Sequence, residues 1–191
     1  MPTEIEAKMK VSDPEVIRRR LEQRGAKPAG ERLETNVFFD TPDRRLLGAG
    51  QGLRLRTNHA VATGKDEYVI TFKGPLRPGD LKSREEREVS VEDASDAAAL
   101  LDALGYKQIV SFQKKRRSWK LEGCKIELDE VPYLGTYVEV EGPDSTCVMK
   151  VRESLGLSNE PMIKTGYVSM LVKYLEDHGI ASRTIAFPDS K

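Results

Sequence analysis

The segment EIEAK at residues 4–8 alternates charged and apolar side chains almost from the start of the chain. Successive side chains of a β-strand point to opposite faces, so Glu4, Glu6 and Lys8 would lie on one face. Ile5 and Ala7 would lie on the other face. This segment therefore predicts a β-strand with one charged face and one face of apolar or small residues.

Six later segments repeat this alternation. Their polar faces carry Arg54 with Arg56, Thr71 with Lys73, Arg84 with Glu86 and Glu88, Lys114 with Arg116, Glu127 with Asp129, and Glu139 with Glu141. In a half-exposed sheet these charges would simply face solvent, which is the usual arrangement. A sheet curved into a barrel would instead place them in a polar bore and turn the apolar face toward covering helices. We favour the barrel because the pattern recurs in so many segments.

Four amphipathic helices are predicted outside this sheet, over about residues 12–24, 95–104, 145–155 and 165–178. Loops rich in proline or glycine are expected at residues 41–52 and 74–82, and a polar hairpin tip at residues 57–66. The 74–82 loop could act as a lid that brings Arg77, Lys82 and Arg84 to an entering anion. The preferred organisation is one α+β domain over residues 1–180, followed by a flexible C-terminal tail at residues 181–191.

Charge is abundant but balanced in this chain. Lys plus Arg and Asp plus Glu each number 31 among 191 residues, so the formal net charge is zero. A neutral chain has no general attraction to nucleic acid or to an anionic membrane. No segment resembles a signal peptide or reaches about 18 consecutive apolar residues, so we expect a soluble cytoplasmic protein. Cys124 and Cys147 lack the spacing of a zinc site or a disulfide framework and are expected to be buried free thiols.

The acidic members of the alternating faces suit a hard divalent cation. Oxygen ligands in closely spaced pairs favour Mg²⁺ or Mn²⁺ over zinc, and they are Glu4, Glu6, Asp129, Glu139 and Glu141. The basic members would hold a polyanion beside that cation, and they are Lys8, Arg54, Arg56, Lys73, Lys114 and Arg116. A salt-bridge network formed only for stability is disfavoured, because desolvating so many ions is costly compared with apolar packing. The two histidines, His59 and His178, give little support to a His-centred triad or a zinc site.

Several motifs, taken together and in order, resemble the CYTH superfamily, the triphosphate tunnel metalloenzymes that include class IV adenylyl cyclases and thiamine triphosphatases. The motifs are Glu4-Ile5-Glu6-Ala7-Lys8, Phe39-Asp40-Thr41-Pro42, Gly52-Leu53-Arg54-Leu55-Arg56, Thr71-Phe72-Lys73-Gly74, Glu127-Leu128-Asp129-Glu130-Val131 and Val138-Glu139-Val140-Glu141, ending with Lys164 and Tyr167-Val168-Ser169-Met170-Leu171. The resemblance covers residues 4–171. It implies a closed tunnel of about eight antiparallel strands, with helices outside and a triphosphate held within.

The resemblance also implies roles for the matching positions. The metal-binding acids would be Glu4, Glu6, Asp129, Glu139 and Glu141, which with Lys8 form the predicted catalytic set. The substrate-binding bases would be Lys8, Arg54, Arg56, Lys73, Arg116 and Lys164, with Arg84 and Lys114 as further tunnel residues on the substrate side. Glu86, Glu88 and Glu127 are expected in the tunnel without an assigned role.

Three functions are compatible with this interpretation. The preferred one is a metal-dependent triphosphatase acting on inorganic triphosphate or a small organic triphosphate, in which water attacks the terminal phosphorus. The alternative is a class IV adenylyl cyclase that converts ATP to cyclic AMP and pyrophosphate, although the first strand lacks the His-Phe pair that precedes the acids in some bacterial enzymes of that class. The third is a polyphosphate- or nucleotide-binding module without turnover. The expected partner is thus a small molecule containing a triphosphate, such as inorganic triphosphate, thiamine triphosphate or ATP.

Overall fold

The chain folds into a closed β-barrel, and the computed structural model describes it over residues 3–188. The strands are β1 (Thr3–Val11), β2 (Lys27–Asp40), β3 (Gly52–Ala60), β4 (Asp66–Lys73), β5 (Lys82–Val91), β6 (Lys107–Leu121), β7 (Cys124–Val131), β8 (Gly135–Glu141) and β9 (Thr184–Ile185). The helices are α1 (Pro14–Gln23), α2 (Arg45–Gly48), α3 (Ala94–Ala103), α4 (Ser145–Ser154) and α5 (Tyr167–Asp177). Strands β1 to β8 follow one another round the barrel in the order β2-β3-β4-β5-β1-β8-β7-β6, and pairing of β2 with β6 closes the ring.

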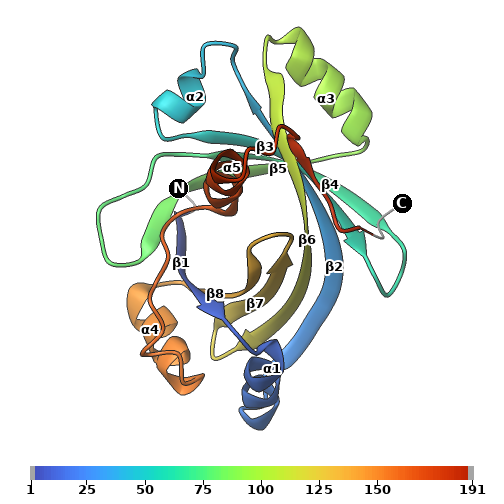
Figure 1. Ribbon diagram of the computed structural model, residues 1–191. Coiled ribbons are helices and arrows are strands. Elements are labelled where there is room, and N and C mark those ends of the chain that lie inside the picture. The colour runs from blue at the N-terminus through green and yellow to red at the C-terminus, as the bar shows by residue number, and fades with distance from the viewer. Residues whose placement is uncertain (1–2, 189–191) are drawn as a thin grey trace.

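Every neighbouring pair in this ring is antiparallel. Figure 1 shows the strands curving round a common centre, with α1, α3 and α4 outside the ring. The predicted α+β fold, a closed antiparallel eight-stranded barrel with helices packed outside, is therefore confirmed.

The two longest strands close the barrel. β2 has 14 residues and β6 has 15, and their pairing runs from Lys27 opposite Lys120 to Asp40 opposite Lys107. β2 was not among the seven segments identified by alternation, because Pro28 and Gly30 make its first half look like a turn. The register does shift between these two residues, which is where a bulge bends a strand.

The segment beyond residue 180 differs from the flexible tail expected at residues 181–191. β9 pairs in parallel with β6, placing Thr184 opposite Ser111 and Ile185 opposite Phe112. This edge of β6 is open because the pairing of β6 with β7 begins only at Lys115. Ile185 is buried in an apolar cluster together with residues of α5. Residues 189–191 lie outside the described part of the chain.

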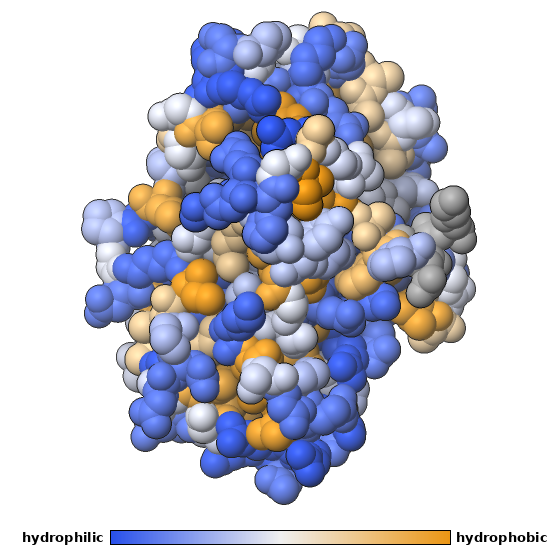
Figure 2. All heavy atoms as spheres, in the orientation of Figure 1, coloured by the Kyte–Doolittle hydropathy of each residue, from blue (hydrophilic) through white to orange (hydrophobic). Residues whose placement is uncertain are grey.

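The helices cover the barrel through three apolar clusters, as the amphipathic pattern predicts. Leu21 of α1 and Val151 of α4 belong to one cluster with strand residues such as Met9. α3 joins β2 and β3 in a second cluster, and α5 joins β6, β7 and β8 in a third. The predicted starts of the helices are correct within a few residues, and the N-cap residue of α3 is Asp93. Figure 2 shows that hydrophilic residues dominate one face of the molecule, with hydrophobic residues in separate small groups between them.

A short helix, α2, lies inside the predicted loop at residues 41–52. The Asp40 carboxylate accepts hydrogen bonds from the backbone N–H groups of Thr41 at 2.7 Å, Leu46 at 3.0 Å and Leu47 at 3.1 Å. Burial alone would raise the pKa of Asp40, but these N–H donors hold that pKa below its usual value. One carboxylate thus fastens α2 to the end of β2.

The other loops differ in detail from the expectation. β3 continues to Ala60, so the hairpin tip is limited to residues 61–65. The 74–82 loop does connect β4 with β5, but Lys82 is the first residue of β5 and is buried. The two cysteines are free, and Cys147 is only half-buried rather than buried. Within residues 3–188, no helix has the length and apolar character needed to span a membrane.

Candidate functional site

A cavity of about 1220 Å³ lies within the barrel. Side chains from the strands form its wall, together with residues of α2, α5 and the segment before α5. Thirteen basic and nine acidic residues line it. The cavity therefore holds a local excess of positive charge, although the formal net charge of the whole chain is zero. Such an excess favours a polyanionic ligand.

The structure brings almost all of the predicted site residues together in this cavity. Those that line it are Glu4, Glu6, Lys8, Arg54, Arg56, Lys73, Arg84, Lys114, Arg116, Glu139, Glu141 and Lys164, with Glu86, Glu88 and Glu127 beside them. Asp129 is the exception among the predicted residues. It is fully buried and is held by Arg116, so it does not line the cavity in this arrangement. Arg77 also lies elsewhere, donating to the Thr3 hydroxyl at 3.1 Å.

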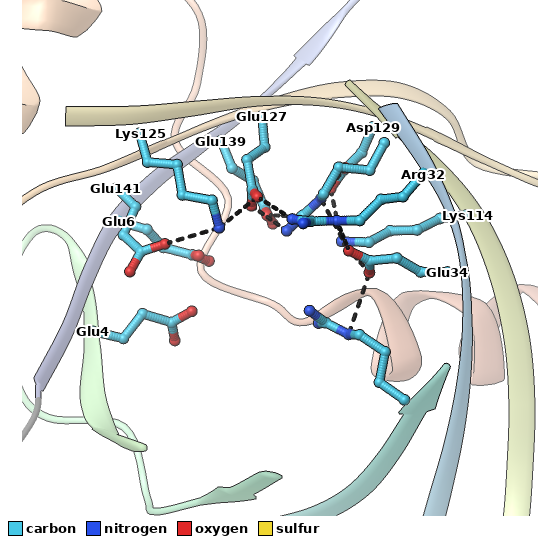
Figure 3. Close-up of polar contacts among 12 residues, drawn as sticks. Glu4, Glu6, Arg32, Glu34, Lys114, Lys125, Glu127, Asp129, Glu139 and Glu141 are labelled. Atoms are coloured by element: carbon cyan, nitrogen blue, oxygen red, sulfur yellow. Dashed lines mark hydrogen bonds and ion pairs between the residues drawn. The ribbon is translucent and has the colours of Figure 1, made fainter. Parts of the chain in front are cut away.

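The acids of β1 and β8 form one wall. The antiparallel register places Glu6 opposite Glu141 and Lys8 opposite Glu139. Figure 3 shows the carboxylates of Glu4, Glu6 and Glu141 facing a common space. One carboxylate oxygen of Glu4, Oε2, is buried and accepts no hydrogen bond from the described residues. This wall therefore carries lone pairs that a ligand could use.

Two acids of this wall have raised pKa values although cations lie near them. Burial and the nearby Glu139 raise the pKa of Glu6 to about 7, although Lys82 donates to Glu6 at 2.5 Å. Burial likewise raises the pKa of Glu141 to about 7, and Lys125 opposes this only in part from 4.0 Å. A cation placed between these carboxylates would lower both pKa values.

The opposite wall is basic. β3 lies four strands from β8 in either direction round the ring, so Arg54 and Arg56 face the acidic wall across the bore. Arg54 donates to the Thr71 hydroxyl at 2.9 Å, and Arg56 donates to the Asn36 side-chain oxygen at 3.0 Å. Burial, followed by repulsion from Arg54, lowers the pKa of Lys73 to about 8. Each of these cations also has a carboxylate partner, namely Glu88 for Arg54, Glu34 for Arg56 and Glu86 for Lys73. An anionic ligand would compete with these carboxylates for a basic wall that is already charged.

Arg116 of β6 links acids of β7 and β8. Its Nε and Nη2 donate to Asp129 at 2.6 and 2.5 Å, and Nη2 also donates to Glu139 at 2.6 Å. Nη1 forms a further ion pair with Glu127. Burial raises the pKa of Glu139, but the cations led by Arg116 outweigh this effect and leave that pKa well below its usual value. Arg116 thus keeps a group of buried carboxylates charged.

Glu34 is a buried acid behind the cavity wall that the sequence interpretation missed. It is fully buried and lies within 3.3 Å of Arg56 and 3.4 Å of Lys114 (Figure 3). Burial would raise its pKa, yet the surrounding cations hold that pKa well below the usual value. The alternation of Arg32, Glu34 and Asn36 in β2 was the available signal.

Two segments meet at the cavity. Lys164 donates to the backbone oxygen of Gly79, which ties the segment before α5 to the 74–82 loop. Lys8 donates to the backbone oxygen of Thr165 at 2.5 Å, which ties the same segment to β1. These bonds explain how Lys164, outside any strand, reaches the cavity.

The predicted metal ligands do not form a ready-made centre. Among residues 3–188, no three Asp, Glu, His or Cys side chains are grouped so as to hold a metal ion. The acids are instead bound by Lys82 and Arg116. The donor set nevertheless fits a hard cation, because all its atoms are carboxylate oxygens and one of them, on Glu4, is buried without a hydrogen bond. Binding a cation here would require these acids to exchange partners.

Comparison with known proteins agrees with this architecture. The CYTH domain model matches residues 2–167. A Methanocaldococcus jannaschii protein named as a candidate adenylate cyclase is 26% identical over 176 residues, covering 87% of this chain and 97% of that protein. An adenylate cyclase of Aeromonas hydrophila is 27% identical over 107 residues, covering 56% of this chain and 51% of that protein.

Solved structures show the same fold. A Pyrococcus horikoshii protein superposes with a TM-score of 0.79 at 27% identity, covering 90% of this chain and 99% of that chain. A candidate adenylyl cyclase from Hippeastrum, described as having a dominant triphosphatase activity, superposes with a TM-score of 0.65 at 20% identity. It covers 91% of this chain and 96% of its own, and this likeness concerns the fold alone.

Proposed function

Because the chain belongs to the CYTH domain family, we propose that it is a divalent-metal-dependent triphosphatase that cleaves inorganic triphosphate or a small organic triphosphate in the barrel cavity. The observation that carries this proposal is the division of the cavity into an acidic wall on β1 and β8 and a basic wall facing it from β3. Carboxylates alone would suit a cation and bases alone would suit any anion. Both walls together suit a phosphate chain that is bound with a metal ion.

The basic side chains would bind and orient the phosphate chain. Arg54 and Arg56 present planar guanidinium groups, which can donate two parallel hydrogen bonds to phosphate oxygens. The remaining bases of the set are Lys8, Lys73, Arg84, Lys114, Arg116 and Lys164. Held in this way, the terminal phosphorus would present one face to the acidic wall, and charge developing on its oxygens would meet fixed cations.

The acids would act after an exchange of partners. In the ligand-free arrangement Arg116 binds Asp129 and Glu139. If a phosphate accepted hydrogen bonds from Arg116 instead, carboxylate oxygens of these acids would become free to bind a cation. Glu4, Glu6, Glu139 and Glu141 would then hold Mg²⁺ or Mn²⁺, and Asp129 would join them only if Arg116 moves away from it. Such a cation supplies charge neutralisation and a bound water of lowered pKa.

A class IV adenylyl cyclase is the second candidate. Two relatives carry adenylate cyclase in their names, which favours this activity. The Hippeastrum protein, which shares the fold, is described as having a dominant triphosphatase activity, so the same fold is compatible with hydrolysis. The cavity also has apolar side chains, including Phe38, Leu47 and Phe112, that could accept an organic group. Cyclisation would need the ribose 3′-oxygen of ATP beside the α-phosphorus, in the same phosphate cradle.

Product analysis distinguishes the candidates. Purified protein is incubated with inorganic triphosphate, thiamine triphosphate or ATP, each with Mg²⁺ or Mn²⁺, and the products are identified by chromatography. Orthophosphate with a diphosphate supports the triphosphatase, and cyclic AMP with pyrophosphate supports the cyclase. Binding without any product would leave a polyphosphate-binding module, and neither binding nor product would remove all three.

A charge-neutral variant tests the acidic wall. Glu141→Gln should lower turnover on the order of tenfold or more, because an amide loses the charge that holds a hard cation. Glu67→Gln is the matched control, since Glu67 is exposed on β4 and does not line the cavity. Equal activity of the two variants would remove Glu141 from the metal site.

The partner exchange predicts cooperation between the two ligands. Mg²⁺ and a slowly hydrolysed triphosphate analogue should together raise the Tm by more than the sum of their separate shifts. Controls with each ligand alone, and correction for the metal–triphosphate complex in solution, exclude chelation as the cause. Strictly additive shifts would contradict a shared site.

A further inference from the structure

Tyr167 is a wall residue of the cavity to which the proposed function assigns no role. It is the first residue of α5 and its side chain is 7% exposed. The hydroxyl is buried and forms no hydrogen bond with the described residues. A buried hydroxyl without a partner costs roughly 1–3 kcal/mol, so its presence in a wall that lines a cavity points to a partner that comes from outside.

The ring of Tyr167 is held from several sides. Lys8 Nζ lies 4.4 Å and Lys114 Nζ lies 5.2 Å from its centroid. The ring of Tyr137 meets it edge-on, with centroids 5.3 Å apart and an interplanar angle of 73°. Both lysines belong to the basic set of the cavity. The ring of Tyr167 thus lies against cations that an anionic ligand would approach.

The start of α5 offers further uncharged donors at the same place. The N-cap residue is Gly166, and no side chain caps the helix. Backbone N–H groups in the first turn of a helix have no acceptor within the helix, and the helix dipole makes this end positive. Gly166, Tyr167, Val168 and Ser169 all line the cavity. The bonds from Lys8 to Thr165 and from Ile163 to the Lys8 backbone oxygen fix this turn against β1.

We infer that the first turn of α5 and the Tyr167 hydroxyl together bind one phosphoryl group of the triphosphate through uncharged hydrogen-bond donors. This inference rests on the proposed function. A tyrosine hydroxyl carries a proton that it can donate to a phosphate oxygen. Arg54, Arg56 and Arg116 of the cavity are paired with carboxylates, and a phosphate must displace these partners before it can bind the arginines. Within residues 3–188, the uncharged donors have no such partner to displace.

The test separates this subsite from a structural role. Inorganic triphosphate is titrated calorimetrically into metal-free protein, using the wild type, Tyr167→Phe and Tyr137→Phe. Tyr167→Phe should bind about three- to tenfold more weakly, because one neutral hydrogen bond is lost. Its Tm without ligand should be equal to or above that of the wild type, since an unpartnered buried hydroxyl has been removed. Tyr137→Phe, which changes a ring that does not line the cavity, should bind as the wild type does.

A second variant tests the helix turn itself. Gly166 has φ −71°, and a Cβ atom added there meets no atom within 4 Å, so the backbone at this position accepts alanine or asparagine. The side-chain amide of Gly166→Asn would cap the helix and occupy the N–H groups, retaining or raising the Tm while weakening triphosphate binding more than Gly166→Ala does. Wild-type affinity in both Tyr167→Phe and Gly166→Asn would overturn the inference but leave the proposed function standing. A wild-type protein that binds no triphosphate, with or without Mg²⁺, would overturn both.

Discussion

Replacing Arg116 with methionine should destabilise the folded protein strongly. Arg116 donates to Asp129 at 2.6 and 2.5 Å and to Glu139 at 2.6 Å, all within buried surroundings. Methionine has a comparable length but no charge, so these carboxylates would lose their guanidinium partner. Removing one member of a buried ion pair costs roughly 3–5 kcal/mol, because the other charge stays buried without compensation.

The partners that remain set the size of this loss. Asp129 keeps Lys114 at 3.0 Å and Glu127 keeps Lys125 at 2.6 Å. Among the described residues, Arg116 is the one cation within 4.0 Å of Glu139. We therefore expect a loss near that of one unpaired charge, about 4 kcal/mol, rather than the sum over three acids. For a chain of this size the Tm would fall on the order of 10 °C.

The loss should also depend on pH. Cations led by Arg116 hold the pKa of Glu139 below its ordinary value of 4.5, despite its burial. A carboxyl group whose pKa is lowered on folding stabilises the protein above its unfolded-state pKa and loses this effect as the pH falls through the folded-state value. The difference between wild type and Arg116→Met should thus be full near neutral pH and shrink in acid below about 4.5.

Urea unfolding followed by the fluorescence of Trp119 measures this difference. Trp119 is the single tryptophan and is buried in β6. Arg117→Met is the matched control, because Arg117 is the next residue on β6 and its ion pair within residues 3–188 is with the exposed side chain of Glu15, at 3.5 Å. The control should change stability little. Equal losses in the two variants, or a loss independent of pH, would refute the account of Arg116.

Other residues give sharper tests of single features. Burial and Glu139 raise the folded-state pKa of Glu6 to about 7, so the folded protein keeps this proton to higher pH than the unfolded chain does, and the free energy of unfolding should fall as the pH rises from about 5 to 7. Urea unfolding at both pH values should show a smaller fall in Glu6→Gln than in the wild type, and an identical fall would contradict the raised pKa. Arg54→Ala should weaken calorimetric binding of inorganic triphosphate about tenfold or more, and unchanged affinity would place Arg54 outside the phosphate site. Asp40→Ala should accelerate amide hydrogen exchange at Leu46 and Leu47, whose N–H groups lose their acceptor; wild-type rates would disprove the anchoring role of Asp40.

Period-two alternation predicted the barrel and most of the cavity wall because it reports which side of a strand each residue occupies. Glu6, Arg54 and Glu139 were predicted to face inward on this ground alone, and they do line the cavity. The same rule overlooked Glu34, since Pro28 and Gly30 disguise the strand that carries it. The alternation of polar residues in β2 is limited to Arg32, Glu34 and Asn36, whereas the strand runs from Lys27 to Asp40.

The partners of each inward residue could not be predicted in the same way. Alternation fixes the face of Asp129 but not the strand beside it, and only the register of β6 against β7 places Arg116 opposite Asp129. That pairing removes Asp129 from the cavity wall. Likewise, Tyr167 belongs to a segment that the sequence predicts as an amphipathic helix covering the barrel. Its contact with Lys8 depends on the path of the chain between β8 and α5, which the sequence pattern does not give.

The closure of the barrel by β2 and β6 has a consequence for the order of folding. Lys27 pairs with Lys120, and Glu6 pairs with Glu141, so the ring joins segments that are synthesised far apart. Contacts of such long sequence separation slow folding, because loop-closure entropy is lost before the contacts form. β1 emerges first from the ribosome yet must wait for β8 before it has both neighbours. A nascent chain in which Glu141 has not yet been synthesised would therefore contain the acids of β1 but no assembled acidic wall, and the binding site would appear only when the ring closes.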